Sequence, residues 1–181
     1  MRTHSSTIRF WLFLCISLAG TFVLAGQAHS TWQAIHGHSG HVETEANLSS
    51  PVIHLGWGLD IHQTPGSTNW VHFAVPSPGA HSQNEHGYNE GARYVKIRFQ
   101  TFSQASVSAV HIYNGGNKIA EFPGSWSGMN TLMLDLGSVR SFPYGLGISV
   151  NIEAEGKLIQ PDAGRIIFYG VGAEFVNIPA K

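Results

Sequence analysis

Cysteine is nearly absent from this chain: its one residue, Cys15, lies in an apolar stretch near the N-terminus. No intramolecular disulfide can form, so a hydrophobic core has to hold the fold. Charged residues are also scarce, at 12% of the sequence, and lysine and arginine form no cluster. Without such a cluster, neither nucleic-acid binding nor attachment to an anionic membrane surface has an electrostatic basis.

Long apolar runs are missing after the first 25 residues. Met1–Arg9 is polar and basic, Phe10–Ala25 is almost wholly apolar, and Gly26-Gln27-Ala28 supplies small residues. This order is typical of a secretory signal peptide, and 16 apolar residues are few for a membrane span, which needs about 20. We expect residues 1–28 to be a signal peptide, and the protein to be secreted or periplasmic.

Residues 29–181 are then expected to form one domain of ordinary size. The signal peptide takes two of the ten basic residues with it, which leaves eight against eleven acidic ones, a formal charge of −3. An exported domain without cysteine is more typical of bacteria than of animal extracellular proteins.

Helical periodicity is absent from this domain, because glycine and proline interrupt every window. Short segments rich in β-branched and aromatic residues, bounded by turn residues, predict strands instead. These segments are Thr31–His36, His41–Glu45, Val52–Leu59, Asn69–Val75, Arg93–Phe102, Ser106–Tyr113, Lys118–Phe122, Thr131–Leu136, Leu146–Ala154 and Arg165–Val176.

Several of these segments alternate apolar and polar residues, as a sheet with one wet face requires. In Arg93–Phe102, for example, Val95, Ile97 and Phe99 share one face. The turn residues in Tyr113–Lys118 predict a hairpin. About ten short strands predict an all-β fold, an antiparallel β-sandwich or jelly roll, with a closed barrel as the alternative.

Residues 31–176 contain a series of short motifs built around tryptophan, glycine and histidine. The motifs are Thr31-Trp32 with His36-Gly37 and Val42-Glu43, Gly56-Trp57-Gly58, Gly66 with Asn69–Pro76, Val107–Asn114 with Ile119, Gly147–Val150, Ile167-Phe168 and Gly172–Phe175. In these motifs the chain resembles a family of uncharacterised bacterial proteins, a domain of unknown function. The resemblance implies a β-sandwich and transfers no activity or site residue.

Histidine is in excess, with 11 residues, most of them between positions 29 and 86. If cleavage follows Ala28, His29 becomes the N-terminus, where its α-amine and ring can bind copper; this resembles the copper brace of secreted polysaccharide monooxygenases. His36 and His38 point the same way on a strand and predict a copper or zinc site, with His54, His62 or His72 as a third ligand. The alternative is that His36 and His72 tie strands together.

Aromatic residues predict a different site, because a flat ring stacks on the apolar face of a sugar. Trp126 lies in a turn-rich segment, and Tyr88 lies in the strand-poor segment Pro76–Gly91 together with Asn84 and Asn89. These four residues are the predicted ligand-binding set. For Trp126 the alternative is a ring folded over the end of the sandwich.

The other tryptophans in strand-like contexts, Trp32, Trp57 and Trp70, are expected in the core. No catalytic residue is predicted, because no serine lies in a G-x-S-x-G motif and no carboxylate pair stands beside a nucleophile. The sequence therefore predicts a non-catalytic binding or structural module with carbohydrate as its ligand. Two alternatives stay open: a metal-binding protein, and a surface protein that self-assembles through exposed strand edges.

Overall fold

The computed structural model describes residues 30–78, 89–156 and 162–178, which form eleven strands, two short 3₁₀ turns and no α-helix. One sheet has six strands: β1 (Ser30–His36), β3 (Ile53–Leu55), β4 (Gly58–His62), β6 (Asn89–Thr101), β9 (Met129–Arg140) and β11 (Arg165–Ile178). The other has five: β2 (His41–Val42), β5 (Thr68–Val75), β7 (Ala105–Asn114), β8 (Asn117–Trp126) and β10 (Leu146–Ala154). The turns are η1 (Gly37–Ser39) and η2 (Glu45–Asn47).

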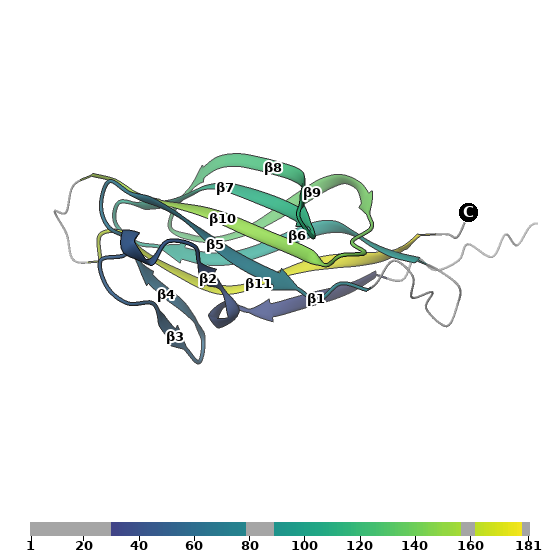
Figure 1. Ribbon diagram of the computed structural model, residues 1–181, viewed down its shortest axis with the longest axis horizontal. Helices are drawn as coiled ribbons and strands as arrows, with labels where there is room; N and C mark the ends of the chain where they lie inside the picture. The colour runs from purple at the N-terminus through teal and green to yellow at the C-terminus, as the bar shows by residue number, and fades with distance from the viewer. Residues whose placement is uncertain (1–29, 79–88, 157–161, 179–181) are drawn as a thin grey trace, which may run out of the picture.

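All strand pairs are antiparallel, so the predicted all-β antiparallel sandwich is confirmed. In the six-stranded sheet the order is β3-β4-β11-β6-β9. The long strand β11 pairs with β4 through its first residues and with β1 through its later ones. Figure 1 shows β1 beside one part of β11, and the β3–β4 hairpin at the other end of the sandwich.

The core lies between the sheets and follows the alternation predicted for β6. Val95, Ile97 and Phe99 are fully buried, whereas Lys96 and Arg98 between them point away from the core. Opposite-facing aromatic rings join the two layers: Phe168 of β11 meets Phe73 of β5 with 5.3 Å between ring centroids. Burial of these rings between two sheets is the main source of stability in a chain without disulfides.

The predicted hairpin is confirmed in β7 and β8, where Asn114 pairs with Asn117 and Gly115 has φ +55°. The predicted strand Val52–Leu59 is wrong as one element. It divides into β3 and β4, which form a tight hairpin with Leu55 opposite Gly58. The two residues at its tip, Gly56 and Trp57, form a turn because a two-residue connection reverses the chain most compactly.

An ion pair joins the inner strands β4 and β11. The Asp60 carboxylate is 3% exposed and accepts hydrogen bonds from Arg165 Nε at 3.0 Å and Nη2 at 2.8 Å. The hydrogen bonds that Arg165 donates to Asp60 raise the pKa of Arg165 above its ordinary value. The buried carboxylate is therefore compensated by a two-point contact that also fixes the geometry of the strand pair.

Candidate functional site

The outer face of the six-stranded sheet carries a groove of about 250 Å³ that runs along β11 between β1 and β6. We call it the aromatic groove. Its lining residues are Trp32, Ala34, Lys96, Arg98, Tyr169, Gly170, Val171 and Gly172.

Glycines form the floor of the aromatic groove. Gly172 lies between Ala34 on β1 and Lys96 on β6. Gly170, two residues earlier on β11, also lies between a β1 residue and a β6 residue, Arg98. Because neither has a side chain, the middle strand leaves a channel between the residues on its neighbours. Gly172 is also needed for packing, since a Cβ there would lie 2.6 Å from the carbonyl oxygen of Gln33.

A β-bulge in β11 turns Tyr169 into the groove. The pairing with β6 shifts between Phe168 and Gly170, so two residues fit where regular pairing has one. Phe168 and Val171 can therefore both face the core while Tyr169 faces outward. The Tyr169 hydroxyl donates a hydrogen bond to Gln100 Oε1 at 2.7 Å, which holds the ring in place.

Trp57, at the tip of the β3–β4 hairpin, extends this aromatic surface. Its ring stacks on Tyr169 with 6.0 Å between centroids and 30° between planes. Trp57 is 50% exposed, and Trp32, at the other end of the groove, is 39% exposed. Three rings on one open sheet face are a surface of the kind that marks a binding site on a soluble domain.

The prediction that Trp32 and Trp57 belong to the core is wrong. Trp32 lies on the outward side of β1, away from the space between the sheets. Trp57 lies on a turn rather than inside a strand. Trp70 is half-buried on the five-stranded sheet, where its ring lies 4.4 Å from that of His111. None of the three rings is enclosed between the sheets.

Two cations hold positions over the rings of the groove. Lys96 Nζ lies 4.1 Å from the Trp32 ring centroid, and the Arg98 guanidinium carbon lies 5.5 Å from the Tyr169 centroid. Both distances allow a cation–π interaction, which keeps each cation close to the ring face. The groove thus combines apolar stacking surface with hydrogen-bond donors.

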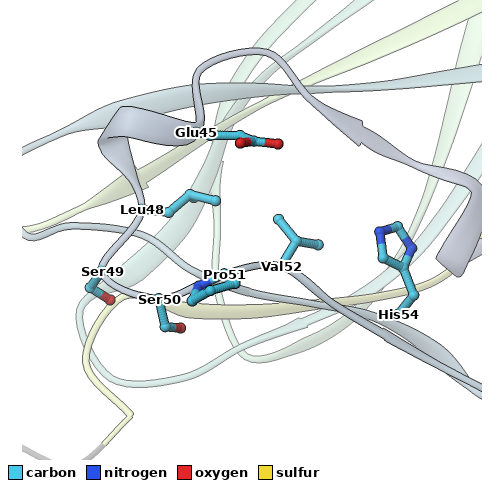
Figure 2. A pocket seen from close by; sticks show the side chains of 7 residues that line it. All are labelled: Glu45, Leu48, Ser49, Ser50, Pro51, Val52 and His54. Atoms are coloured by element: carbon cyan, nitrogen blue, oxygen red, sulfur yellow. The ribbon is translucent and has the colours of Figure 1, made fainter.

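A second hollow, of about 510 Å³, lies between the η2 turn and β3. Figure 2 shows Glu45 at the top and His54 at the right, with Val52 between them and Leu48 at the left. His54 Nδ1 donates a hydrogen bond to the carbonyl oxygen of His38 at 2.7 Å. Ser49, Ser50 and Pro51 complete the lining, so among the described residues the imidazole of His54 is the one aromatic ring in it, and no Trp, Tyr or Phe lines the hollow.

Trp126, the first residue predicted to bind a ligand, is partly buried and packs against the core. Its ring lies over Gly124, where a Cβ would overlap it. The neighbouring serines, Ser125 and Ser127, border a polar hollow of about 400 Å³ that Trp126 does not line. Ligand binding by Trp126 stays a prediction, and the structure places its ring in the alternative position, folded onto the sandwich.

The remaining predicted ligand residues are not placed. Tyr88 and Asn84 lie outside the described residues, and so does His29. Asn89 begins β6 opposite Ile178, but its side chain lies outside the description. Their roles stay predictions.

The prediction that His36 and His38 share a strand is wrong: His36 ends β1, His38 lies in the η1 turn, and His72 lies on the other sheet. His36 and His38 are exposed and adjacent, with 2.7 Å between their Nδ1 atoms. His72 lies on β5, where Nδ1 is 2.8 Å from Ser149 Oγ and Nε2 is 3.1 Å from Glu43 Oε2. Among the described residues, no three His, Cys, Asp or Glu side chains gather around a point that could hold a metal ion.

Sequence reasoning missed Tyr169 and the groove around it. The signal was present in the order Tyr169-Gly170-Val171-Gly172, because glycine inside a strand indicates a bulge or the close approach of another group. Two glycines next to a tyrosine within one strand therefore indicate a candidate binding site.

No helix within the described ranges is long and apolar enough to cross a membrane. No protein-family model matches the chain, and no curated protein matches it.

Solved structures do resemble it. The low-affinity xylan-binding module CBM86 from the gut symbiont Roseburia intestinalis matches with a TM-score of 0.50 and 12% identity, over 80% of this chain and 96% of its own. A family 29 carbohydrate-binding module matches with a TM-score of 0.41 and 10% identity, over 82% and 89%. At these identities the likeness to CBM86 shows a shared β-sandwich fold.

Proposed function

We propose that this protein is a non-catalytic carbohydrate-binding module that holds a glycan in the aromatic groove. One observation carries the proposal: Trp32, Tyr169 and Trp57 lie on a single open sheet face, with the first two in one groove. Sugar rings have apolar faces that stack on aromatic rings and hydroxyl groups that accept hydrogen bonds from side chains such as Lys96 and Arg98.

The shape of the groove supports a chain-like ligand. Its volume of about 250 Å³ lies just below the roughly 300–1,000 Å³ of sites that enclose a drug-sized molecule. It lies on an open sheet face, so a polysaccharide can pass over it and place one or two rings on the aromatic surface. The Tyr169 part of the stacking surface is preformed, because its hydroxyl is held by Gln100.

The shared fold with a module that binds xylan supports the proposal at the level of architecture. The resemblance to an uncharacterised bacterial β-sandwich family belongs to the same proposal. Export is a further part of it, supported by the signal-peptide pattern in residues 1–28. Fractionation of a bacterial host with intact-mass measurement of the protein tests export, because a chain that stays in the cytoplasm with residues 1–28 attached contradicts it.

The site is tested with Trp32→Ala, Tyr169→Ala and Trp57→Ala, measured by affinity electrophoresis against soluble plant polysaccharides. Tyr144→Ala is the matched control, because Tyr144 is 77% exposed and does not line the groove. We expect Trp32→Ala and Tyr169→Ala each to weaken binding about tenfold or more, as loss of an aromatic anchor does. The control should bind like the parent protein.

Trp126→Phe separates this site from the one predicted from the sequence. This substitution keeps an aromatic ring packed on the core but removes the indole that a ligand would contact. If Trp126→Phe abolishes retardation and the groove variants do not, the site lies at that end of the sandwich. If all variants bind like the parent, or the parent binds no glycan, the proposal is wrong.

A second candidate function is metal binding by His36 and His38. The 2.7 Å between their Nδ1 atoms is close to the separation of neighbouring ligands on a copper ion, and imidazole suits both copper and zinc. Calorimetric titration with each metal tests this function. Metal uptake by the parent that persists in His36→Ala/His38→Ala contradicts a site at this pair.

A further inference from the structure

The aromatic groove carries positive charge that the rest of the sheet does not balance. Among the described residues, Arg93, Lys118 and Arg165 each pair with a carboxylate. Within the same ranges Lys96 and Arg98, together with Arg140, form no ion pair. Two of these three unpaired cations therefore lie in one groove.

The two groove cations face the same way. Lys96 and Arg98 are two residues apart on β6. Each lies between two residues that are buried in the core, so both side chains point to the outer face of the sheet. Alternate residues on one face of a strand stand about 7 Å apart. The residues paired with them on β11 are Gly172 and Gly170, so neither cation has a side chain directly opposite it on that strand.

The carboxylates on this face leave the middle of the groove uncompensated. Asp135 is engaged by Arg93, with 2.8 Å between Arg93 Nε and Asp135 Oδ1. Glu174 is level with Trp32 and Tyr94 at the end of the groove, and it makes no ion pair with Lys96. The ligand that would complete the site is therefore one that brings its own negative charge.

We infer that the aromatic groove binds glycans that contain uronic acids, a step that rests on the proposed function. A uronic acid has an apolar ring face for Trp32 or Tyr169 and a carboxylate for Arg98 and Lys96. The arginine fork matches the planar carboxylate with two parallel hydrogen bonds, and the lysine adds a point charge. A neutral sugar would use the rings and leave both cations without a counter-charge.

The test compares soluble oligogalacturonate with the same oligomer methyl-esterified, by calorimetry at low and at high salt with a chelator present. Esterification removes the charge and keeps the sugar ring, so the pair isolates the carboxylate. We expect the acid form to bind about tenfold more tightly than the ester, with the difference shrinking at high salt.

Three variants assign the effect to residues. Arg98→Met and Lys96→Met keep much of the side-chain stem and remove the charge, whereas Arg140→Met removes an unpaired charge outside the groove. We expect Arg98→Met to lose about tenfold in affinity for the acid oligomer and little for the ester. Arg140→Met should bind both as the parent does, and unchanged thermal unfolding confirms that each variant is folded.

Equal affinity for acid and ester overturns this inference and leaves the proposed function standing. Tighter binding of a single-stranded oligonucleotide than of either glycan also overturns it, because aromatic rings and cations together also suit nucleic acids. If neither oligomer nor any neutral polysaccharide binds, the proposed function fails as well.

Discussion

At the scale of single residues, Asp60 is a charged group that is buried, at 3% exposure. Burial removes the hydration of a carboxylate, which costs free energy unless hydrogen bonds from other groups replace it. The Arg165 contact therefore largely determines whether Asp60 stabilises or destabilises the fold. The Arg165 guanidinium also lies over the Phe102 ring, 4.7 Å from its centroid, which links β11 to the end of β6.

Arg165→Met therefore should lower the free energy of unfolding by about 2 to 4 kcal/mol, because it removes the two-point contact and leaves the buried Asp60 carboxylate only His62, whose Nε2 lies 3.5 Å from Oδ1. Urea denaturation of the two proteins measures the difference. Asp60→Asn in the Arg165→Met background should recover part of the loss, since it removes the uncompensated charge. A double variant as unstable as Arg165→Met would show that the ion pair is not the cause.

Gly172 is a second residue whose identity the packing requires. Gly172→Ala should lower stability by about 1 to 3 kcal/mol, because its Cβ would lie 2.6 Å from the Gln33 carbonyl oxygen and force β1 away. Gly170→Ala is the matched control, since its nearest neighbour, the Ile35 carbonyl oxygen, would be at 3.4 Å. Thermal unfolding compares the two; equal effects would contradict the close approach of β1.

At the scale of elements, most strands follow from local pattern. The alternation in β6, β9 and β10 predicts their buried faces, because each has one side on the core. The bulge in β11 and the break between β3 and β4 do not follow from it. The glycines of β11 indicate a bulge, but its exact place and the break between β3 and β4 depend on how each strand fits its neighbours.

The β7–β8 turn offers a test at this scale. Gly115→Ala should destabilise the protein by about 1 kcal/mol, because Gly115 has φ +55° and its Cβ would meet the Tyr144 side chain at 2.8 Å. Gly116→Ala changes the neighbouring residue, which has open space around it, and should cost far less. Chemical denaturation of both variants measures this, and an equal loss would mean that turn conformation is not limiting.

At the scale of the whole molecule, the sandwich is held by rings that meet between the sheets. Phe168 is fully buried and contacts both Phe73 and Phe99, with centroids 5.3 and 6.1 Å away. The position of the candidate site also belongs to this scale. Trp32 and Val95 are both apolar residues on strands, and only the packing of the layers decides that one faces solvent and the other the core.

Phe168→Ala should lower the free energy of unfolding by about 3 to 5 kcal/mol, because it opens a cavity where the two sheets meet. Met133→Ala, on the outer face at 52% exposure, should change it by less than about 0.5 kcal/mol. Urea denaturation with and without a reducing agent gives both values, and the reducing agent should have no effect on a chain with one cysteine. A small loss for Phe168→Ala would mean that the layers are joined elsewhere.

The central place of β11 has a consequence for the order of assembly. This strand joins β1, β4 and β6, yet it comes after all of them in the chain. During synthesis from the N-terminus, β1 has no neighbour to pair with, and the β3–β4 hairpin stays separate from the β6–β9 pair. The groove, whose floor and one of whose rings belong to β11, can take shape only when Arg165–Ile178 has emerged.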